Sequence, residues 1–230
     1  MKRLLIITQR DPFFIDSFLE ELTHENQVTI LDLPNFNKGK IWAIKRAIDL
    51  YGFAGFIKLL FERVKIFFLK RKKINSIKIH KTQDMNSYIN NLVKGDFLLS
   101  LSAPGLIDTD QIPMGVNAIN IHSGALPQYA GMMPIFWQLL DGKKSITLTF
   151  HELAKSIDTG AIYLEKEIEF EQSLFKTSVK AKKIAAKIFS EYFLKNNFKI
   201  SRYQNSESHR LNKFPENDDV CRLRKKIKLI

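Results

Sequence analysis

Three side chains that can move protons or stabilise negative charge lie close together in the middle of the sequence. Asn120 and His122 end a short apolar run, Val116–Ile121, that is typical of a strand, and Asp158 stands in a loop before Gly160. Because side chains alternate along a strand, Asn120 and His122 should point the same way. An amide donor, an imidazole and a carboxylate can together stabilise an oxyanion and transfer a proton.

Each of these residues also has an ordinary structural interpretation. A single His after a strand is more often structural than catalytic, and Asp-Thr-Gly alone is typical of a turn. A Ser-His-Asp hydrolase could be assembled with Ser102 or Ser123, but no G-x-S-x-G elbow precedes a helix in this sequence. Residue types and spacing alone therefore leave the chemistry open.

The stretch from Asp96 to Phe170 resembles the folate-dependent formyltransferases. Their pattern reads roughly N-x-H-x-S-x-L-P-x-y-x-G-x-x-P, followed by a strand and D-x-G. The upstream run Asp96–Ile107 also resembles the strand and loop that precede this motif in the family. The matching positions in this sequence are Asn120, His122, Leu126, Pro127, Tyr129, Gly131, Pro134, Asp158 and Gly160.

Two departures from the family pattern refine the resemblance. Where many members have Ser two residues after the His, this chain has Gly124, with Ser123 just before it. The form H-x-G-x-L-P-x-Y-A-G is similar to members that formylate nucleotide-linked amino sugars. The Gly-Val-Thr often found in the later strand is Thr147-Leu148-Thr149 here, a change that should mostly affect packing.

The resemblance implies a fold, a co-substrate and a role for each of the three residues. The fold is expected to be α/β, a Rossmann-like formyltransferase core with a mainly parallel sheet, and the formyl donor 10-formyltetrahydrofolate, with no metal. Asn120 would donate to the oxyanion formed when an amine attacks the formyl carbon. His122 would act as general base and then acid, and Asp158 would orient the imidazole.

The resemblance also implies where the two substrates bind. The pterin slot maps to the loops 102–104 and 152–157, with Ser102, Ala103, Pro104, Leu153 and Ile157 as candidate folate contacts. The loop that contains the Gly-Pro-rich motif would face the amine acceptor. Its candidate contacts are Gly124, Tyr129 and Met132, although Tyr129 could equally serve loop packing.

The acceptor expected from these features is a nucleotide-linked amino sugar, as in surface-glycan, O-antigen or lipopolysaccharide biosynthesis. Methionyl-tRNA is the less favoured alternative because a C-terminal β-barrel of about a hundred residues would normally accompany that activity. Glycinamide ribonucleotide remains open. A formyl-folate hydrolase is less similar around H-x-G, and a non-catalytic binding module on the same fold would not need all three polar residues.

Hydrophobic periodicity predicts alternating strands and helices, with no G-x-G-x-x-G after the first strand. Strands are expected at Lys2–Thr8, Gln27–Leu33, Ser76–His80, Phe97–Ala103, Val116–Ile121, Ile146–His151 and Ala161–Phe170. Helices are expected at Phe13–Leu22, Ile41–Leu50, Phe56–Leu69, Met85–Val93, Ile135–Leu140 and Val179–Phe193.

The organisation expected is a formyltransferase core over residues 1–172 and a C-terminal appendage over 173–230. Lys199–Tyr203 and Lys226–Ile230 would form short strands in that appendage, which could mediate a homodimer. The single Cys221 excludes an intrachain disulfide, and the apolar run Leu4–Ile7 is too short for a signal peptide, so a cytoplasmic protein is expected.

Positive charge is concentrated in one region of a chain whose net charge is +12. Between Lys38 and Lys81 there are 13 Lys or Arg residues and only two acids, Asp49 and Glu62. Such a surface could meet an anionic small molecule, a membrane or only solvent; nucleic acid is not favoured. Within this region the stripe Ile57, Leu60, Phe61, Val64, Phe67 and Phe68 is expected to pack in the core, with a subunit contact or peripheral membrane docking as alternatives.

Overall fold

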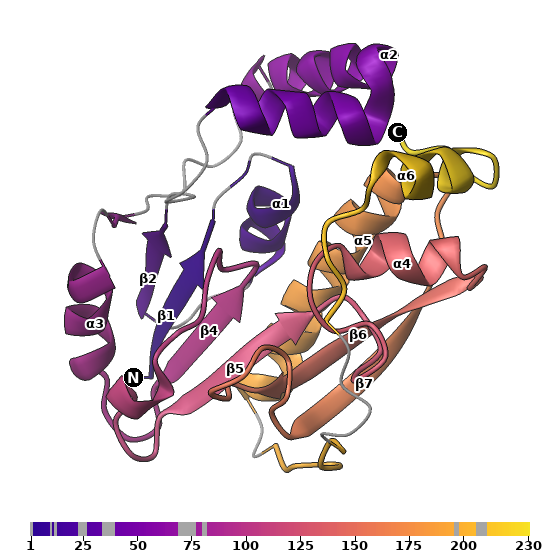
Figure 1. Cartoon of the computed structure of the whole chain (residues 1–230). Coiled ribbons are helices and arrows are strands. Elements are labelled where there is room, and N and C mark those ends of the chain that lie inside the picture. The colour runs from indigo at the N-terminus through magenta and orange to yellow at the C-terminus, as the bar shows by residue number, and fades with distance from the viewer. Residues whose placement is uncertain are drawn as a thin grey trace.

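A seven-stranded mixed sheet organises the fold (Figure 1). The structure is a computed structural model that describes residues 2–9, 11, 13–22, 27–33, 40–68, 77–79, 82–195, 198–205 and 211–230. The strand order is β3-β2-β1-β4-β5-β6-β7. The first five strands in this order are parallel to their neighbours, whereas β6 is antiparallel to both β5 and β7. The strands are β1 (Arg3–Thr8), β2 (Gln27–Asp32), β3 (Ile77–Lys78), β4 (Phe97–Leu101), β5 (Asn117–His122), β6 (Ser145–Glu152) and β7 (Ile162–Glu169). The expected α/β fold with a mainly parallel sheet is confirmed.

Strand β1 is buried on both faces of the sheet, which explains why it is apolar without interruption. Leu4 and Ile6 belong to one apolar cluster, whereas Leu5 and Ile7 belong to a second cluster on the opposite face. The first cluster includes residues of α1, α4, α5 and α6, and the second includes residues of α3. The helices are α1 (Phe14–Glu21), α2 (Lys40–Phe68), α3 (Thr82–Asn90), α4 (Pro134–Leu140), α5 (Leu174–Ile188) and α6 (Asn217–Arg224), with short turns η1 (Thr109–Gln111) and η2 (Phe189–Phe193).

The chain changes direction across the sheet between β1 and β4. Strands β1, β2 and β3 follow one another to one edge, and β4 then returns to the other side of β1. In open α/β sheets, ligands bind outside the carboxyl ends of the strands at such a switch point. Ser102 follows β4 directly and His122 ends β5, so both lie at this edge.

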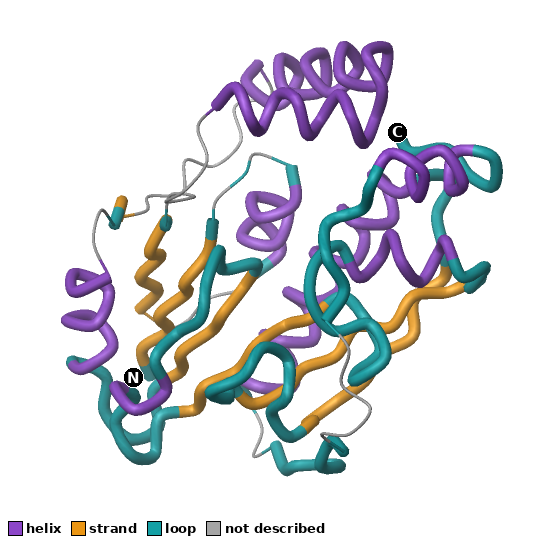
Figure 2. Tube along the Cα trace, viewed as in Figure 1, coloured by secondary structure: helices purple, strands orange, loops and turns teal. Residues whose placement is uncertain are grey.

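The C-terminal part of the chain differs from the expectation in three respects. Helix α5 starts at Leu174, earlier than predicted, because the Ser173 hydroxyl accepts a hydrogen bond from the Lys176 N–H at 3.2 Å and caps the helix. The polar segment Asn217–Arg224 is a helix that periodicity did not reveal. The short strands predicted at Lys199–Tyr203 and Lys226–Ile230 are wrong: both ranges are described and hold only isolated bridges, and much of the described chain after α5 is loop (Figure 2).

The C-terminal residues are nevertheless part of the core. Phe193 stacks on Phe150 of β6 with ring centroids 5.1 Å apart, and Phe198 contacts Phe193 at 4.8 Å. Leu223 of α6 is fully buried in the same cluster. The boundary at residue 172 stays a prediction, but the segment after it completes the packing on one face of the sheet.

Helix α2 is two helical segments joined at a kink. Gly52 has φ 75° and ψ 167°, which breaks the helix between the two segments predicted from the sequence. Arg224 of α6 donates hydrogen bonds to the carbonyls of Asp49 and Leu50, both at 3.2 Å, and so satisfies the end of the first segment. Figure 1 shows α2 at one end of the molecule, beside the C-terminus and apart from the sheet.

The apolar stripe of the second segment does not pack in the core, contrary to the expectation. Leu60, Phe61, Val64 and Phe68 are all exposed, and Ile57 is half-buried, while the side chain of Phe67 lies outside the described part of the structure. The reason is geometric. The first segment of α2 packs against the core at Leu50, and α2 also contacts α6, so only a narrow side of its second segment faces the body of the protein. Over the described residues, no helix is both long and apolar enough to cross a membrane.

Candidate active site

Strand β5 carries Asn120 and His122 to the carboxyl edge of the sheet, as predicted. Ile119 and Ile121 point into the apolar cluster on one face, so the two polar residues share the other face. The Asp158 carboxylate lies between them: its Oδ1 is 3.2 Å from Asn120 Nδ2, and its Oδ2 is 3.4 Å from His122 Nδ1. The structure therefore brings together all three residues that the sequence singled out.

Asp158 is held by its loop rather than by a strand. Its φ is +56°, a left-handed conformation that Asp tolerates better than most residues, and its Oδ2 accepts a 2.8 Å hydrogen bond from the Gly131 N–H. Gly160 allows the loop to close, because a Cβ there would lie 1.8 Å from the Glu152 carbonyl oxygen. The Asp-Thr-Gly triplet is thus both a tight turn and the support of a buried carboxylate.

The two nitrogens of His122 face different partners. Nε2 lies 2.7 Å from the Tyr129 carbonyl oxygen, which can only accept, so this nitrogen carries a hydrogen. In neutral His122 the lone pair is then on Nδ1, directed at the Asp158 carboxylate. A proton arriving at Nδ1 would turn this contact into an ion pair, so the arrangement suits a group that accepts a proton during a reaction.

A second imidazole, which the sequence interpretation missed, belongs to the same network. His151, near the end of β6, has Nδ1 2.8 Å from the Glu152 carbonyl oxygen, so Nδ1 carries the hydrogen of the neutral ring. Its Nε2 can therefore accept the 2.9 Å hydrogen bond from Asn120 Nδ2. This bond and the contact with Asp158 fix the orientation of the Asn120 amide.

Burial and charge act in opposite directions on the ionisable groups. Burial alone would raise the pKa of Asp158, but His122, His151 and the Gly131 N–H lower it to about 2. Burial lowers the pKa of His122 from 6.5, although Asp158 opposes the effect. At neutral pH the site therefore holds a carboxylate beside a neutral imidazole.

Gly124 leaves room for the His122 ring. A Cβ at this position would lie 2.7 Å from Pro134 Cβ and 2.9 Å from His122 Nε2. The Gly124 carbonyl is held by Thr149, whose buried hydroxyl donates to it at 2.7 Å. The Gly found where many family members have Ser is therefore required by the present packing, and Thr149, which keeps the Thr of the family's Gly-Val-Thr, fixes its carbonyl.

A buried lysine lies at the switch point beside this network. Lys182 of α5 donates from Nζ to Ser102 Oγ at 3.0 Å, and burial lowers its pKa from 10.5 to about 8 while the charge of Asp11 raises it. Asp11 in turn accepts hydrogen bonds from the Phe13 and Phe14 N–H groups at the start of α1. No motif marks Lys182, which resembles any other lysine of a basic helix.

Two C-terminal segments hold the loops of the site. Gln204 Nε2 donates to the Asp158 carbonyl at 2.9 Å and to the Gly160 carbonyl at 2.7 Å. Asn212 exchanges backbone hydrogen bonds with Ala130 and Met132, both at 2.8 Å. Sequence reasoning missed both residues, because single polar residues in coil carry no periodic signal.

Backbone strain is confined to these loops. Within the described part of the chain, the non-glycine residues with positive φ are Ser102, Met133 and Asp158. They stand in the loop after β4, before α4 and in the Asp-Thr-Gly turn, which surround the His122 network. Such conformations cost free energy and persist where the surroundings determine them, often at functional sites.

The predicted folate contacts lie on two loops that share one apolar cluster. Ala103 and Leu153 both pack against the cluster beneath α3, and the exposed Lys155–Asp110 ion pair at 2.9 Å joins the second loop to η1. Pro104 and Ile157 are exposed. Their contact with folate stays a prediction.

The predicted acceptor contacts differ in exposure. Met132 is exposed, whereas Gly124 and Tyr129 are buried. The Tyr129 hydroxyl donates to Asp141 Oδ2 at 3.0 Å, and burial with Asp141 raises its pKa to about 12. The side chain of Tyr129 thus serves loop packing in this structure, while its carbonyl reaches His122.

A cavity of about 510 Å³ lies elsewhere, between α2, the start of α5 and the C-terminus, and includes none of the predicted site residues. Cavity size therefore does not mark the chemistry in this chain. No group of three or more His, Cys, Asp or Glu side chains suited to a metal was found over the described residues.

Comparison with known proteins agrees with this geometry. Residues 109–191 match the model of the Formyl transferase family, a range that contains Asn120, His122 and Asp158. Over this range, just over a third of its length, the chain is similar to the formyl transferases.

Curated relatives match part of their own length only. The bifunctional polymyxin resistance protein ArnA of Wigglesworthia glossinidia brevipalpis is 30% identical over 47% of this chain and 18% of its own. A methionyl-tRNA formyltransferase of Lactobacillus acidophilus is 27% identical over 43% of this chain and 31% of its own. The chain therefore spans less than a third of these relatives.

Solved structures share the fold over most of the chain. A sugar N-formyltransferase from Shewanella has a TM-score of 0.58 at 17% identity, covering 92% of this chain and 76% of that one. The N-formyltransferase of Helicobacter canadensis, solved with folinic acid and dTDP-3-aminofucose, has a TM-score of 0.58 at 16% identity and covers 97% and 80%. At these identities the likeness establishes the formyltransferase fold.

Proposed function

We propose that the protein is a folate-dependent N-formyltransferase that moves the formyl group of 10-formyltetrahydrofolate to the amine of a nucleotide-linked amino sugar. The observation that carries the proposal is the convergence of Asn120, His122 and Asp158 at the carboxyl edge of the sheet, within 3.4 Å of a shared carboxylate. A packing role alone would not need two buried polar groups and a half-buried amide joined in one network.

The reaction forms one C–N bond and breaks another. The amine nitrogen attacks the formyl carbon, which gives a tetrahedral centre with a negative oxygen and a positive nitrogen. The new nitrogen loses a proton, N10 of the folate gains one, and the bond between N10 and the formyl carbon breaks. The protein must therefore stabilise one developing charge and transfer one proton.

The residues present suit these two tasks. His151 and Asp158 accept the two amide hydrogens of Asn120, and a shift of one of them to the oxyanion would favour the tetrahedral centre. His122 can accept the amine proton at Nδ1, where Asp158 stabilises the imidazolium, and can then return it toward N10. Held by Gly131 and Gln204, Asp158 would keep its place through both steps.

The loops at the switch point are suited to hold the folate. Lys182 fixes Ser102, which has a φ of 53° and opens the loop 102–104, and Leu153 anchors the loop opposite. We propose that the pterin ring lies between them, in contact with Ala103, Pro104 and Ile157. No metal is required, because Asn120 and His122 supply the electrostatic stabilisation.

The amino-sugar acceptor is supported by the Gly124 variant of the motif and by sugar N-formyltransferases among the structures that share the fold. The alternative acceptor is methionyl-tRNA, which the names of curated relatives favour. The positive net charge of +12 suits a nucleotide diphosphate and a nucleic acid alike, so charge does not separate the two. The homodimer and the cytoplasmic location remain predictions.

The experiment that tests the proposal is an end-point assay with 10-formyltetrahydrofolate and separate acceptors: nucleotide-linked amino sugars, methionyl-tRNA, glycinamide ribonucleotide and no acceptor. We expect release of tetrahydrofolate only with an amino sugar, together with a product heavier by one carbonyl group. Release of tetrahydrofolate with methionyl-tRNA alone would show that methionyl-tRNA, and not an amino sugar, is the acceptor. Release without any acceptor would indicate hydrolysis, and folate binding without release would refute the proposed activity.

A further inference from the structure

The second segment of α2 exposes a continuous set of large apolar side chains. Phe53 is 69% exposed, Phe61 64%, Val64 50% and Leu60 42%. Residues three, four, seven or eight apart in a helix lie on one side, and these four follow that spacing. Gly55 and Leu59, which are buried, fall on the opposite side. The segment is therefore amphipathic with its apolar side outward.

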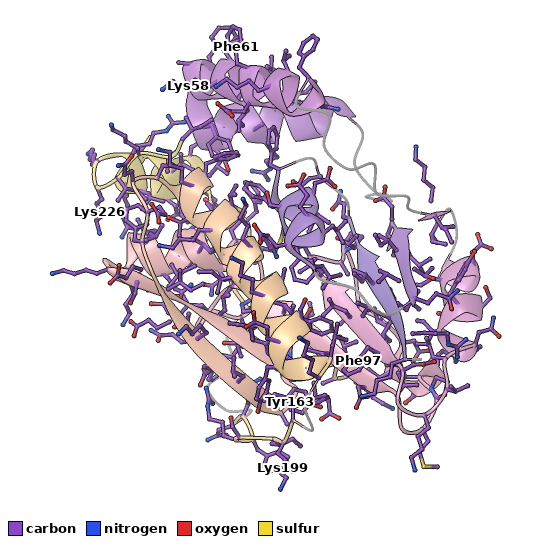
Figure 3. All side chains as sticks on the ribbon, turned by 180° about the vertical axis from the view of Figure 1, so that it is seen from behind. Lys58, Phe61, Phe97, Tyr163, Lys199 and Lys226 are labelled. Carbon is purple, nitrogen blue, oxygen red and sulfur yellow. The ribbon has the colours of Figure 1, made fainter. Side chains whose placement is uncertain are left out.

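Figure 3 shows the same orientation directly. Phe61 points away from the body of the protein at the outer side of α2, and Lys58 extends from the same segment. The neighbour that α2 contacts most among the described elements is α6, which meets it from the inner side. Nothing in the described part of the chain covers the side that carries Phe61.

Basic side chains border the apolar side on both flanks. With 3.6 residues per turn, Lys58 and Lys65 fall beside it on one flank and Arg63 on the other, and all three are exposed. Lys65 also pairs with Glu62 at 2.9 Å. Over the range 40–68 there are six basic and two acidic residues. Long basic side chains beside an apolar strip can reach the phosphate layer of a bilayer while the strip enters the acyl chains.

A second copy of the chain would fit this surface less well. In a two-fold contact the same patch meets itself, so the basic borders would approach each other. An anionic surface satisfies both the apolar strip and its borders, and a helix too polar to span a bilayer can still lie in its interface.

We propose that α2 docks the protein on an anionic phospholipid bilayer, with Phe53, Leu60, Phe61 and Val64 entering the interface and Lys58, Arg63 and Lys65 facing lipid phosphates. Charge and apolar area act together: each basic residue near an anionic bilayer strengthens binding roughly fivefold. The proposal is independent of the reaction, because binding is measured without folate or acceptor.

The test is sedimentation of the whole protein with vesicles. The protein should bind vesicles of phosphatidylcholine with about one-third phosphatidylglycerol, bind pure phosphatidylcholine far less, and dissociate at high salt. The double variant Phe53→Ser/Phe61→Ser should weaken binding at least tenfold. Its matched control is Val93→Ser/Met114→Ser, which changes two exposed apolar residues that precede β4 and β5, outside α2, and should bind as the parent does.

A charge series separates the two contributions. Lys58→Gln/Arg63→Gln/Lys65→Gln should lower affinity on the order of a hundredfold at low salt. The control Lys94→Gln/Lys143→Gln/Lys199→Gln removes as much charge at exposed positions elsewhere and should lower it less than tenfold. Equal losses in the two triple variants would show general charge attraction and overturn the docking surface.

Two further results would overturn the proposal. Failure of the parent protein to sediment with anionic vesicles at low salt would do so. So would a dimer in sedimentation velocity that Phe53→Ser/Phe61→Ser converts to monomer, because the strip would then be a contact between copies. Circular dichroism of each variant checks that its helices are retained.

Discussion

The His122 network and the outer side of α2 depart from the usual placement of side chains in opposite ways. Around His122, polar groups are buried: Asp158, His151 and Lys182 are all largely removed from solvent. On α2, aromatic and aliphatic side chains are in solvent while lysines border them. Charged groups are rarely buried without partners, and contiguous exposed apolar side chains usually mark a contact.

The difference lies in how each region obtains its partners. The buried groups are satisfied within the chain: Asp158 by Gly131 and Asn120, and Lys182 by Ser102. Their positions are thus determined before any ligand arrives, as catalysis requires. The apolar side of α2 has no such partner among the described residues. The first region therefore suits the proposed chemistry, and the second suits the proposed docking.

The largest effect is expected when the polar network is broken at its centre. His122→Ala removes the group proposed to accept the amine proton, and loss of general acid–base catalysis typically costs 10²–10⁴-fold in rate, so turnover should fall by about that factor. The readout is tetrahydrofolate release with the best acceptor, at equal folded protein by circular dichroism. Retention of more than a tenth of the parent rate would remove His122 from the mechanism.

A smaller loss is expected when the network is displaced rather than cut. Gly124→Ala places a methyl group 2.9 Å from His122 Nε2, so the ring must shift. Misplacement of a catalytic group by about 1 Å costs on the order of a hundredfold in rate, and we expect a loss of that order in kcat. Gly105→Ala is the matched control, because a Cβ there meets no atom within 4 Å. Equal activity of the two variants would show that the loop containing Gly124 can move without displacing His122.

The sequence predicts some features of these two regions and not others, and the reason is physical. The network was foreseeable at Asn120, His122 and Asp158, because the strand pattern and an ordered motif mark them together. The residues that support them were not: Gln204 and Asn212 act through single hydrogen bonds from coil. Such contacts depend on tertiary folding and leave no local pattern.

The α2 stripe shows the complementary limit. Its spacing correctly predicted a helix with one apolar side, but period 3.6 gives only the relative positions of side chains. Whether that side meets the core or solvent depends on how the helix docks, here through Arg224 and Leu50. The residue pattern thus correctly predicted an amphipathic helix, but the prediction that its apolar side packs in the core was wrong.

The buried lysine gives a pH-dependent effect of intermediate size. In the unfolded chain Lys182 has a pKa near 10.5, and in the fold about 8, so the unfolded state binds more protons between these values. Stability attributable to Lys182 should therefore rise with pH across this window, by about 3 kcal/mol. Comparison of urea unfolding of the parent and Lys182→Met at pH values below and above it measures this rise.

A second readout connects Lys182 to function. If it positions Ser102 for the folate, Lys182→Met should raise the KM for 10-formyltetrahydrofolate about tenfold and change kcat less, because one hydrogen bond to a charged donor is lost. Lys183→Met, half-exposed on the same helix, is the control. A pH-dependent change in stability without any change in KM would leave Lys182 a structural residue only.

The smallest effect is expected on the outer side of α2, where it sharpens the comparison most. Phe61→Ser should change the free energy of unfolding by no more than about 0.5 kcal/mol, because the side chain contacts solvent in the folded state. Phe18→Ser in α1, where the ring is fully buried, should cost about 3–5 kcal/mol. Urea denaturation of both variants in the absence of lipid is the measurement.

A loss of unfolding free energy at Phe61 comparable to that at Phe18 would mean that the protein itself covers the strip in solution, and the contrast between the two regions would then disappear. A loss that depends on protein concentration would instead place a second copy on the strip, since association stabilises the folded state by mass action.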